Sequence, residues 1–451
     1  MVAGPVLFLV IGLALVFIIL STSVLKIHPF LSLLLAALGV GIAVNMPVKQ
    51  VVETISTGFG SLMGYIGLVV VLGTIIGVVL EKSGAAHRIA DLVLKALGPQ
   101  KPALSMSVIG LVVGIPVFCD SGFIILSGIN RALASRSKVA KGTLSISLAS
   151  GLYTSHTLIP PTPGPIAAAG NLGAANYLGT VILVGLAISV PVVLVAYAYA
   201  NWIGRKFDGS RTAALPVAAP AASQQVAAPG LLRSLAPILV PIVLISLASL
   251  VPFLPLPEAW GAALGFLGLP LVALLIGVFL CVFLLPKWDS AYVSGWVGEG
   301  ILQAGPILIL TGAGGAFGAV LKATPISELV SHWITTGQHT GGYILVISFL
   351  IAAILKTSQG STTSALVITS SMLSPLMSTI GFASPLELSL LVMAIGSGSM
   401  VVSHANDSFF WVVTQFSGMP VKEAYRGFTI VTLLQGLTGL LVTLLLFYLL
   451  V

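Results

Sequence analysis

Long apolar segments follow one another along almost the whole chain, separated by short polar stretches. Most contain roughly 20 residues, the length of helix that crosses a bilayer core about 30 Å thick. Strands of a membrane barrel would instead alternate apolar and polar residues over about ten positions. The pattern therefore predicts an all-α integral membrane protein. The predicted spans are residues 5–22, 29–45, 60–80, 142–157, 177–200, 235–252, 261–285, 299–321, 387–402 and 428–450.

Two further apolar stretches, 104–134 and 341–378, are interrupted at their centres. The first is broken by a segment that contains Asp120, and the second by a polar segment that begins at Lys356. Non-helical backbone at membrane depth is tolerated only where protein buries it or where it lines an aqueous cavity. We therefore expect each stretch to form a re-entrant hairpin that returns to the side it entered.

Composition agrees with this interpretation. Hydrophobic residues make up 57% of the 451 residues and charged residues only 7%, whereas soluble domains contain about 25% charged residues. The net charge of +7 is spread over short loops, which excludes a basic face for nucleic acid. If the loop at 81–103 is cytoplasmic, nearly all Lys and Arg residues lie inside, as the positive-inside rule requires. This arrangement predicts ten crossings and two hairpins, with both termini outside.

An Ala- and Pro-rich segment, 207–232, is expected to be a cytoplasmic linker. It divides the chain into similar halves, 1–206 and 233–451, in which a Gly-x-x-x-Gly-x-x-Leu pattern precedes a hairpin and a span that ends in Ser-His. Each half has an odd number of predicted crossings, five, so the two halves are expected to be inverted repeats. Such repeats are typical of secondary transporters, whose binding sites lie near the midplane at discontinuous helices.

The first half supplies two discontinuities with polar residues. In the hairpin, Asp120 is a carboxylate at membrane depth, which marks a pathway or a binding site, and Ser121 and Gly122 follow it. The alternative for Asp120 is a helix cap. The second discontinuity is the broken span 142–170, in which Thr154, Ser155 and His156 precede a cluster of prolines. His156 is a candidate proton relay, or else a core histidine bonded to a backbone carbonyl.

The second half supplies two more discontinuities with polar residues. The tip of its hairpin presents hydroxyls and an amide that suit a polyhydroxylated ligand, in residues Thr357, Ser358, Gln359, Ser361 and Thr362. Lys356 is expected to pair with a substrate carboxylate, with Asp120 or with Asp407, or else to extend to the membrane interface. The broken span 387–416 carries the strongest polar cluster, formed by Ser403, His404, Asn406, Asp407 and Ser408. One of its residues is alternatively the cap of a helix that restarts there.

No nucleotide-binding loop and no metal-ligand spacing is found in the sequence. We therefore expect no cofactor, no catalytic residue and no metal.

These break residues resemble the gluconate permease family of the ion-transporter superfamily. The resemblance lies in Val117 to Phe123, in Ser155 to Pro165 with Ala167 to Gly170, in Thr311 to Gly318 and in Val402 to Trp411. It implies a homodimeric symporter of the bacterial inner membrane, in which a fixed frame holds a mobile domain. It also implies that protons drive the uptake of gluconate-like acids, glycerate or D-serine.

Two positions depart from the family pattern. Thr162 stands where a His is common, so a proton role there is not carried over. Cys119 and Ser121 make the first tip smaller and more polar than usual, which suggests a substrate other than gluconate. The alternatives are a sodium-coupled carboxylate carrier, a channel, and an intramembrane enzyme in which Asp120 and Asp407 form a catalytic pair.

Overall fold

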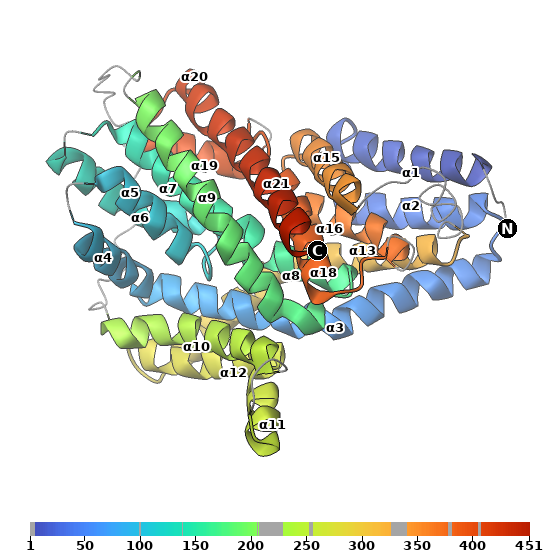
Figure 1. The fold of residues 1–451 in the computed structure, drawn as a ribbon, viewed down its shortest axis with the longest axis horizontal. Coiled ribbons are helices and arrows are strands. Elements are labelled where there is room, and N and C mark those ends of the chain that lie inside the picture. Colours follow the sequence, from blue (N-terminus) through green and yellow to red (C-terminus); the bar gives the residue numbers. More distant parts are fainter. Residues whose placement is uncertain are drawn as a thin grey trace.

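The computed structural model is helical in every element that it describes (Figure 1). It describes residues 5–98, 101–137, 139–204, 206, 229–251, 256–325, 341–377, 381–404 and 407–451. Most of the predicted linker therefore lies outside the described residues. Among the described helices, four are long and apolar enough to cross a membrane, and two bent helix pairs raise this number to six. The all-helical membrane fold is confirmed, whereas the ten crossings and the inverted repeats stay predictions.

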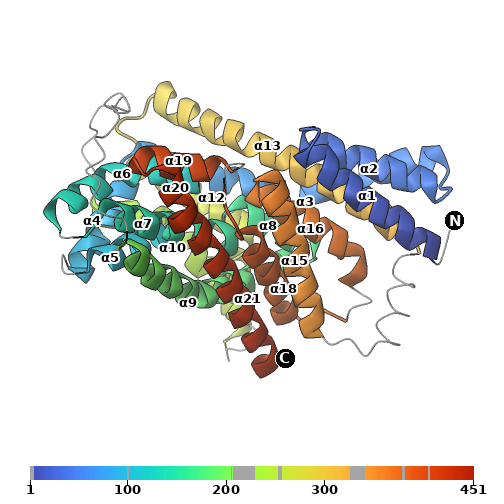
Figure 2. The same cartoon turned by 90° about the horizontal axis from the view of Figure 1, so that it is seen from above.

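Two long helices, α3 (Val48–Lys82) and α13 (Ser290–Lys322), run side by side along the molecule (Figure 2). Their backbones touch where Gly58 faces Gly315, because neither residue has a side chain to keep the helices apart. At one end of this pair lies the hairpin of α1 (Pro5–Ser23) and α2 (Pro29–Ala43). Along one side of α3 lie α10 (Leu231–Leu250) and α12 (Pro270–Cys281), which continues into η3 (Val282–Leu284). Between them in the chain, α11 (Glu258–Leu267) projects away from α3 (Figure 1).

The first interrupted stretch forms α5 (Pro102–Val113) and α6 (Cys119–Arg136), which follow the short helix α4 (Ala85–Leu97). The next helix, α7 (Lys141–Leu158), ends before Pro160, because a proline disfavours helical backbone in the residue that precedes it. The chain restarts as α8 (Pro163–Asn171) with a proline in its first turn, where no N–H is needed. It continues through η1 (Ala175–Tyr177) into α9 (Leu178–Gly204).

The second interrupted stretch forms α15 (Gly341–Gln359) and α16 (Thr362–Leu373), followed by η4 (Ser374–Leu376). The α15 helix ends where Gly360 adopts a φ of 76°, a left-handed conformation that glycine tolerates. The α16 helix begins where the Ser361 hydroxyl accepts a hydrogen bond from the Ser364 N–H at 3.2 Å. The two helices are therefore separated by a turn of two residues.

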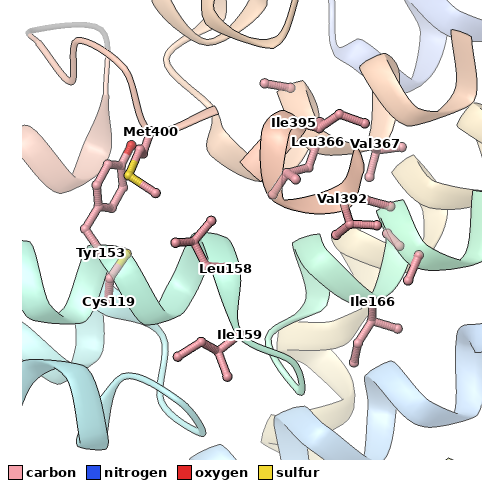
Figure 3. Packing of buried hydrophobic residues seen from close by; sticks show 14 of the residues in the cluster. Cys119, Tyr153, Leu158, Ile159, Ile166, Leu366, Val367, Val392, Ile395 and Met400 are labelled. Atoms are coloured by element: carbon pink, nitrogen blue, oxygen red, sulfur yellow. The ribbon is translucent and has the colours of Figure 1, made fainter. Parts of the chain in front are cut away.

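The last break separates α18 (Pro385–Ser399) from α19 (Ser408–Ser417). A capping box of Ser384 and Glu387 begins α18. After α19, the short α20 (Val421–Ala424) and a π-helical turn, η5 (Tyr425–Thr429), lead into α21 (Ile430–Leu450). The core lies among α7, α16 and α18, which are buried on all sides. Their apolar side chains fill the space between the breaks (Figure 3).

Candidate functional site

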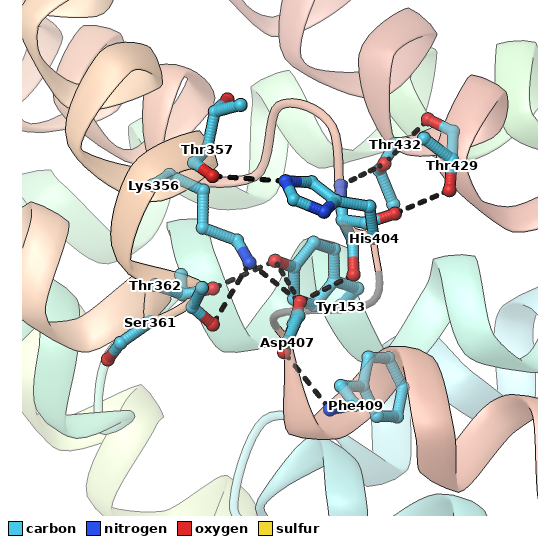
Figure 4. Close-up of polar contacts among 12 residues, drawn as sticks. Tyr153, Lys356, Thr357, Ser361, Thr362, His404, Asp407, Phe409, Thr429 and Thr432 are labelled. Carbon is cyan, nitrogen blue, oxygen red and sulfur yellow. Dashed lines mark hydrogen bonds and ion pairs between the residues drawn. The ribbon is translucent and has the colours of Figure 1, made fainter. Parts of the chain in front are cut away.

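A buried ion pair joins the second hairpin to the second broken span. Lys356, in the last turn of α15, places its Nζ 2.6 Å from Oδ2 of Asp407, the residue that precedes α19 (Figure 4). The side chain of Lys356 is 0% exposed and that of Asp407 is 6% exposed, so this lysine does not extend to the membrane interface. The ammonium also donates to the carbonyl of Gly360 at 3.2 Å. Because desolvating two charges is costly, such a pair requires close geometry and further hydrogen bonds.

The carboxylate of Asp407 receives those further bonds. Its Oδ2 accepts from the Ser403 hydroxyl at 2.5 Å and, more weakly, from the Tyr153 hydroxyl at 3.5 Å. Its Oδ1 accepts from the Phe409 N–H at 3.0 Å and so caps α19, as the sequence analysis allowed. The N-terminus of a helix favours negative charge. Both carboxylate oxygens of Asp407 therefore accept hydrogen bonds.

Tyr153 of α7 connects this ion pair to the first half of the chain. Its hydroxyl shares a hydrogen bond of 2.8 Å with the hydroxyl of Thr362, at the start of α16. Its ring stacks on that of Phe409, with centroids 5.4 Å apart. A buried tyrosine needs a partner for its hydroxyl, and here that partner lies on the opposite hairpin.

The backbone is strained at Val402, and the two residues that follow it are held by hydrogen bonds. Val402 has a φ of 55°, which is unusual for a β-branched residue. The next residue, Ser403, donates its N–H to Thr432 at 3.0 Å, and its carbonyl accepts from Thr429 at 2.6 Å. The ring Nε2 of His404 lies 3.0 Å from the carbonyl of Thr357 on the second tip. Strained backbone persists only where its surroundings hold it, and it is common at functional sites.

Asp120 lies in the first turn of α6, close enough to Lys356 and Asp407 to interact electrostatically with both. The cap of α6 is Phe118, which makes no side-chain hydrogen bond, so Asp120 is not the capping residue. Its Oδ1 is buried and has no hydrogen-bond partner among the described residues. The neighbouring Ser121 lies close to the carboxylate of Glu81 on α3. Gly122 lies against Leu152 of α7.

His156 is buried in the last turn of α7, and it also lies within electrostatic range of Lys356 and Asp407. Its ring lies beside Phe118, with centroids 6.0 Å apart. The Nδ1 atom is buried without a partner in the described part of the chain. The alternative of a core histidine satisfied through Nδ1 is therefore not what the structure shows.

Three other candidate side chains are either hydrogen-bonded to nearby helices or exposed. The hydroxyl of Thr154 accepts from Gln435 at 2.6 Å and donates to the carbonyl of Ser150. Ser155 donates to carbonyls of its own helix and lies against Gly114. Ser408 is exposed at the first position of α19. The structure therefore does not direct these three residues toward the ion pair.

On the second tip, Ser361 caps α16 and Thr362 bonds to Tyr153. The amide of Gln359 is buried, and neither its oxygen nor its nitrogen has a partner among the described residues. Two predicted site positions lie outside this description, namely Asn406 and the side chain of Ser358. In the parts of the chain that the structure describes, no cluster of three or more His, Cys, Asp or Glu side chains could hold a metal.

The sequence analysis missed several residues of the site: Glu81, Tyr153, Gly360, Thr429, Thr432 and Gln435. Tyr153 directly precedes the predicted Thr154-Ser155-His156 cluster, and its polar atom in an apolar span was a usable signal. Thr429, Thr432 and Gln435 lie in a span with no break. Only the three-dimensional arrangement brings them to the site.

A comparison with known families matches residues 5–450 to the model described as GntP family permease. The chain is 31% identical to the gluconate permease of Pseudomonas aeruginosa, covering 93% of each protein. It is also 31% identical to the inner membrane permease YgbN of Escherichia coli, again covering 93% of each. The YdaH transporter of Alcanivorax borkumensis has a similar structure, with a TM-score of 0.68 and 14% identity over 93% of this chain and 98% of that one.

Proposed function

Because the chain belongs to the GntP family of permeases, we propose that it imports gluconate or a related small hydroxy acid by proton symport. As a permease it is a transporter and not an enzyme, and it is a multi-pass protein of the bacterial inner membrane. The acids considered are gluconate, glycerate, D-serine and other sugar acids. Gluconate is favoured because a relative of similar length is a gluconate permease.

The observation that carries this proposal is the buried Lys356–Asp407 pair beside polar atoms that lack partners. Asp120 Oδ1, His156 Nδ1 and the Gln359 amide are all buried and unpaired among the described residues. A buried polar group without a hydrogen bond costs about 1–3 kcal/mol. A polyhydroxylated acid would satisfy such groups, with its carboxylate on Lys356 and its hydroxyls on the histidine and the amide.

The charges of the site give a reason for coupling. Lys356 contributes one positive charge, and ionised Asp120 and Asp407 contribute two negative charges, so the empty site carries one net negative charge. A bound carboxylate adds a second negative charge, which is costly at membrane depth. One proton taken up with the acid restores the original charge. When the substrate carboxylate competes for Lys356, Asp407 loses its main counter-charge, and it or Asp120 accepts that proton.

We propose that transport proceeds by alternating access. The two hairpins and the two broken spans form the mobile domain, and the remaining helices form a fixed frame that includes the surface of a homodimer. Glycines on α3 support this division, since Gly77 lies against the carbonyl of Pro116 and Gly73 against that of Pro161. At both discontinuities of the first half, the fixed frame therefore contacts the mobile domain through glycines, which have no side chain.

The decisive test is uptake of labelled gluconate into proteoliposomes with an imposed inward proton gradient. Glycerate and D-serine serve as unlabelled competitors that rank the substrates. We expect accumulation that collapses when a protonophore is added, which also excludes a channel. Accumulation that follows a sodium gradient at fixed pH would show that sodium, and not protons, drives the transport. Absence of both uptake and competition in sealed liposomes would overturn the assignment of the substrate.

A further inference from the structure

A large polar cavity lies between the long helix pair and the ends of α8 and α16. Its volume is about 680 Å³, within the usual range for small-molecule sites. The first half of α3 lines one wall with hydroxyl and amide side chains, and Asn171 and Ser371 line the opposite wall. Glycines of α13 expose backbone between the two walls. The polar side chains among these residues offer hydrogen-bond donors and acceptors to a hydroxylated solute.

This cavity is separate from the buried ion pair. Thr362, the first residue of α16, contacts the ion-pair cluster, whereas Ser371, near the other end of that helix, lines the cavity. Nine residues of α-helix span about 14 Å. Beside the cavity, the Asn171 amide joins α8 to α16, because it donates to the hydroxyls of Ser370 and Ser371 at 2.8 and 3.0 Å. A solute in the cavity would therefore not touch Lys356.

One positive and one negative side chain line the cavity, and only the positive one lacks an oppositely charged partner among the described residues. Lys322, in the last turn of α13, and Glu53 both line it. Glu53 has its own partner in Lys49, with the charged atoms 3.9 Å apart. Lys322 has no acidic partner among the described residues. In the topology that the positive-inside rule predicts, Lys322 is one of the few basic residues in an outer segment, on the face where an imported solute arrives.

We propose that this cavity is a second, outward-facing binding site for the transported hydroxy acid. Lys322 pairs with the carboxylate, and the hydroxyls and amides of α3 and Asn171 bind the hydroxyl groups. The identity of the ligand rests on the proposed function, whereas the site itself rests on the cavity and its lining. Such a site concentrates the acid at the outer face before it reaches the buried pair.

The first test compares the kinetics of uptake by Lys322→Gln with those of the unchanged protein. The matched control is Lys322→Arg, which keeps the positive charge at the cavity. An exposed ion pair contributes up to about 1 kcal/mol, which corresponds to a KM raised about three- to five-fold. We expect that rise for Lys322→Gln alone, with an unchanged maximal rate. An equal KM in both variants, while gluconate is still transported, would overturn the second site and leave the proposed function intact.

A second measurement does not depend on transport. Thr57 lines the cavity, and Thr57→Cys would react with a membrane-impermeant methanethiosulfonate, since the native Cys119 and Cys281 are buried. We expect gluconate to protect this cysteine but not Val48→Cys, at a position that is 62% exposed and outside the cavity. Adding Lys322→Gln should remove the protection. Absence of protection would contradict the site, whereas protection without uptake would support the site and refute the proposed transport of gluconate.

Discussion

Tyr153 and Thr362 are 209 positions apart in the sequence and share a hydrogen bond of 2.8 Å. This bond joins the first broken span to the second hairpin, and the same tyrosine hydroxyl reaches Asp407 at 3.5 Å. The two halves of the chain therefore meet at the ion pair through one side chain. Any change in the charge of Asp407 acts directly on this contact.

Replacing Tyr153 by Phe removes the hydroxyl and keeps the ring that stacks on Phe409. We expect a loss of stability of about 1 kcal/mol, because the buried Thr362 hydroxyl loses its partner. Tyr153→Ala should cost about 3–5 kcal/mol, since it also leaves a cavity. Thermal unfolding in detergent measures both changes. Equal losses for the two variants would show that the hydroxyl and not the ring carries the stabilisation.

Removing either member of the Lys356–Asp407 pair leaves the other as an uncompensated buried charge. Lys356→Met and Asp407→Asn should each lower stability by about 3–5 kcal/mol and abolish uptake. The double variant should recover most of the stability, because neither member of the pair is left as a buried charge without its partner, but it should not recover uptake. Melting temperature and uptake are measured on the same preparations. Recovered transport in the double variant would refute a role of this pair in binding or coupling.

Asp120→Asn tests the proton step with little effect on the fold. The replaced Oδ1 has no partner among the described residues, and Asp120 does not cap α6. We therefore expect the protein to remain folded. Accumulation driven by a proton gradient should fall at least ten-fold, whereas exchange of labelled for unlabelled substrate should persist. If gradient-driven accumulation is unchanged, Asp120 is not the proton acceptor.

Gly77→Ala tests the contact between the frame and the first hairpin. An added methyl group would collide with the carbonyl oxygen of Pro116 in the turn before α6. Gly60→Ala, on the same helix, is the matched control, because nothing lies within 4 Å of a methyl group there. We expect Gly77→Ala to slow uptake strongly and Gly60→Ala to leave it unchanged. If both variants transport gluconate at similar rates, the close contact between Gly77 and Pro116 is not needed for transport.

Local signals in the sequence located where helices end. The prolines from Pro160 onward follow the end of α7 at Leu158, and Gly360 separates α15 from α16. These signals act through backbone geometry and need no knowledge of distant neighbours. Hydrophobicity likewise indicated a helical membrane protein, since lipid requires every backbone group to be bonded internally.

Contacts between distant segments were beyond such signals. The sequence left three possible partners for the charge of Lys356, and only the fold shows that this partner is Asp407. Thr154 and Ser155 have the same chemistry as useful ligand groups, yet their hydroxyls are used within α7 and by Gln435. Whether a hydroxyl binds a ligand or a backbone carbonyl depends on packing. The pattern of residue types along the chain does not contain that information.

The bonds between distant segments also bear on how the protein is made. Asn171 donates to Val367, Ser370 and Ser371, and Gln435 donates to the carbonyl of Ser150, 285 positions earlier. When the first half enters the membrane, those partners have not yet been synthesised. The early helices therefore cannot reach their final packing before the last helix is inserted. Until then, the Asn171 amide must bind other groups. The last step in the biogenesis of this permease is thus the association of its two halves within the bilayer. Before that step, polar groups that later bond across the halves are accessible to a chaperone or insertase.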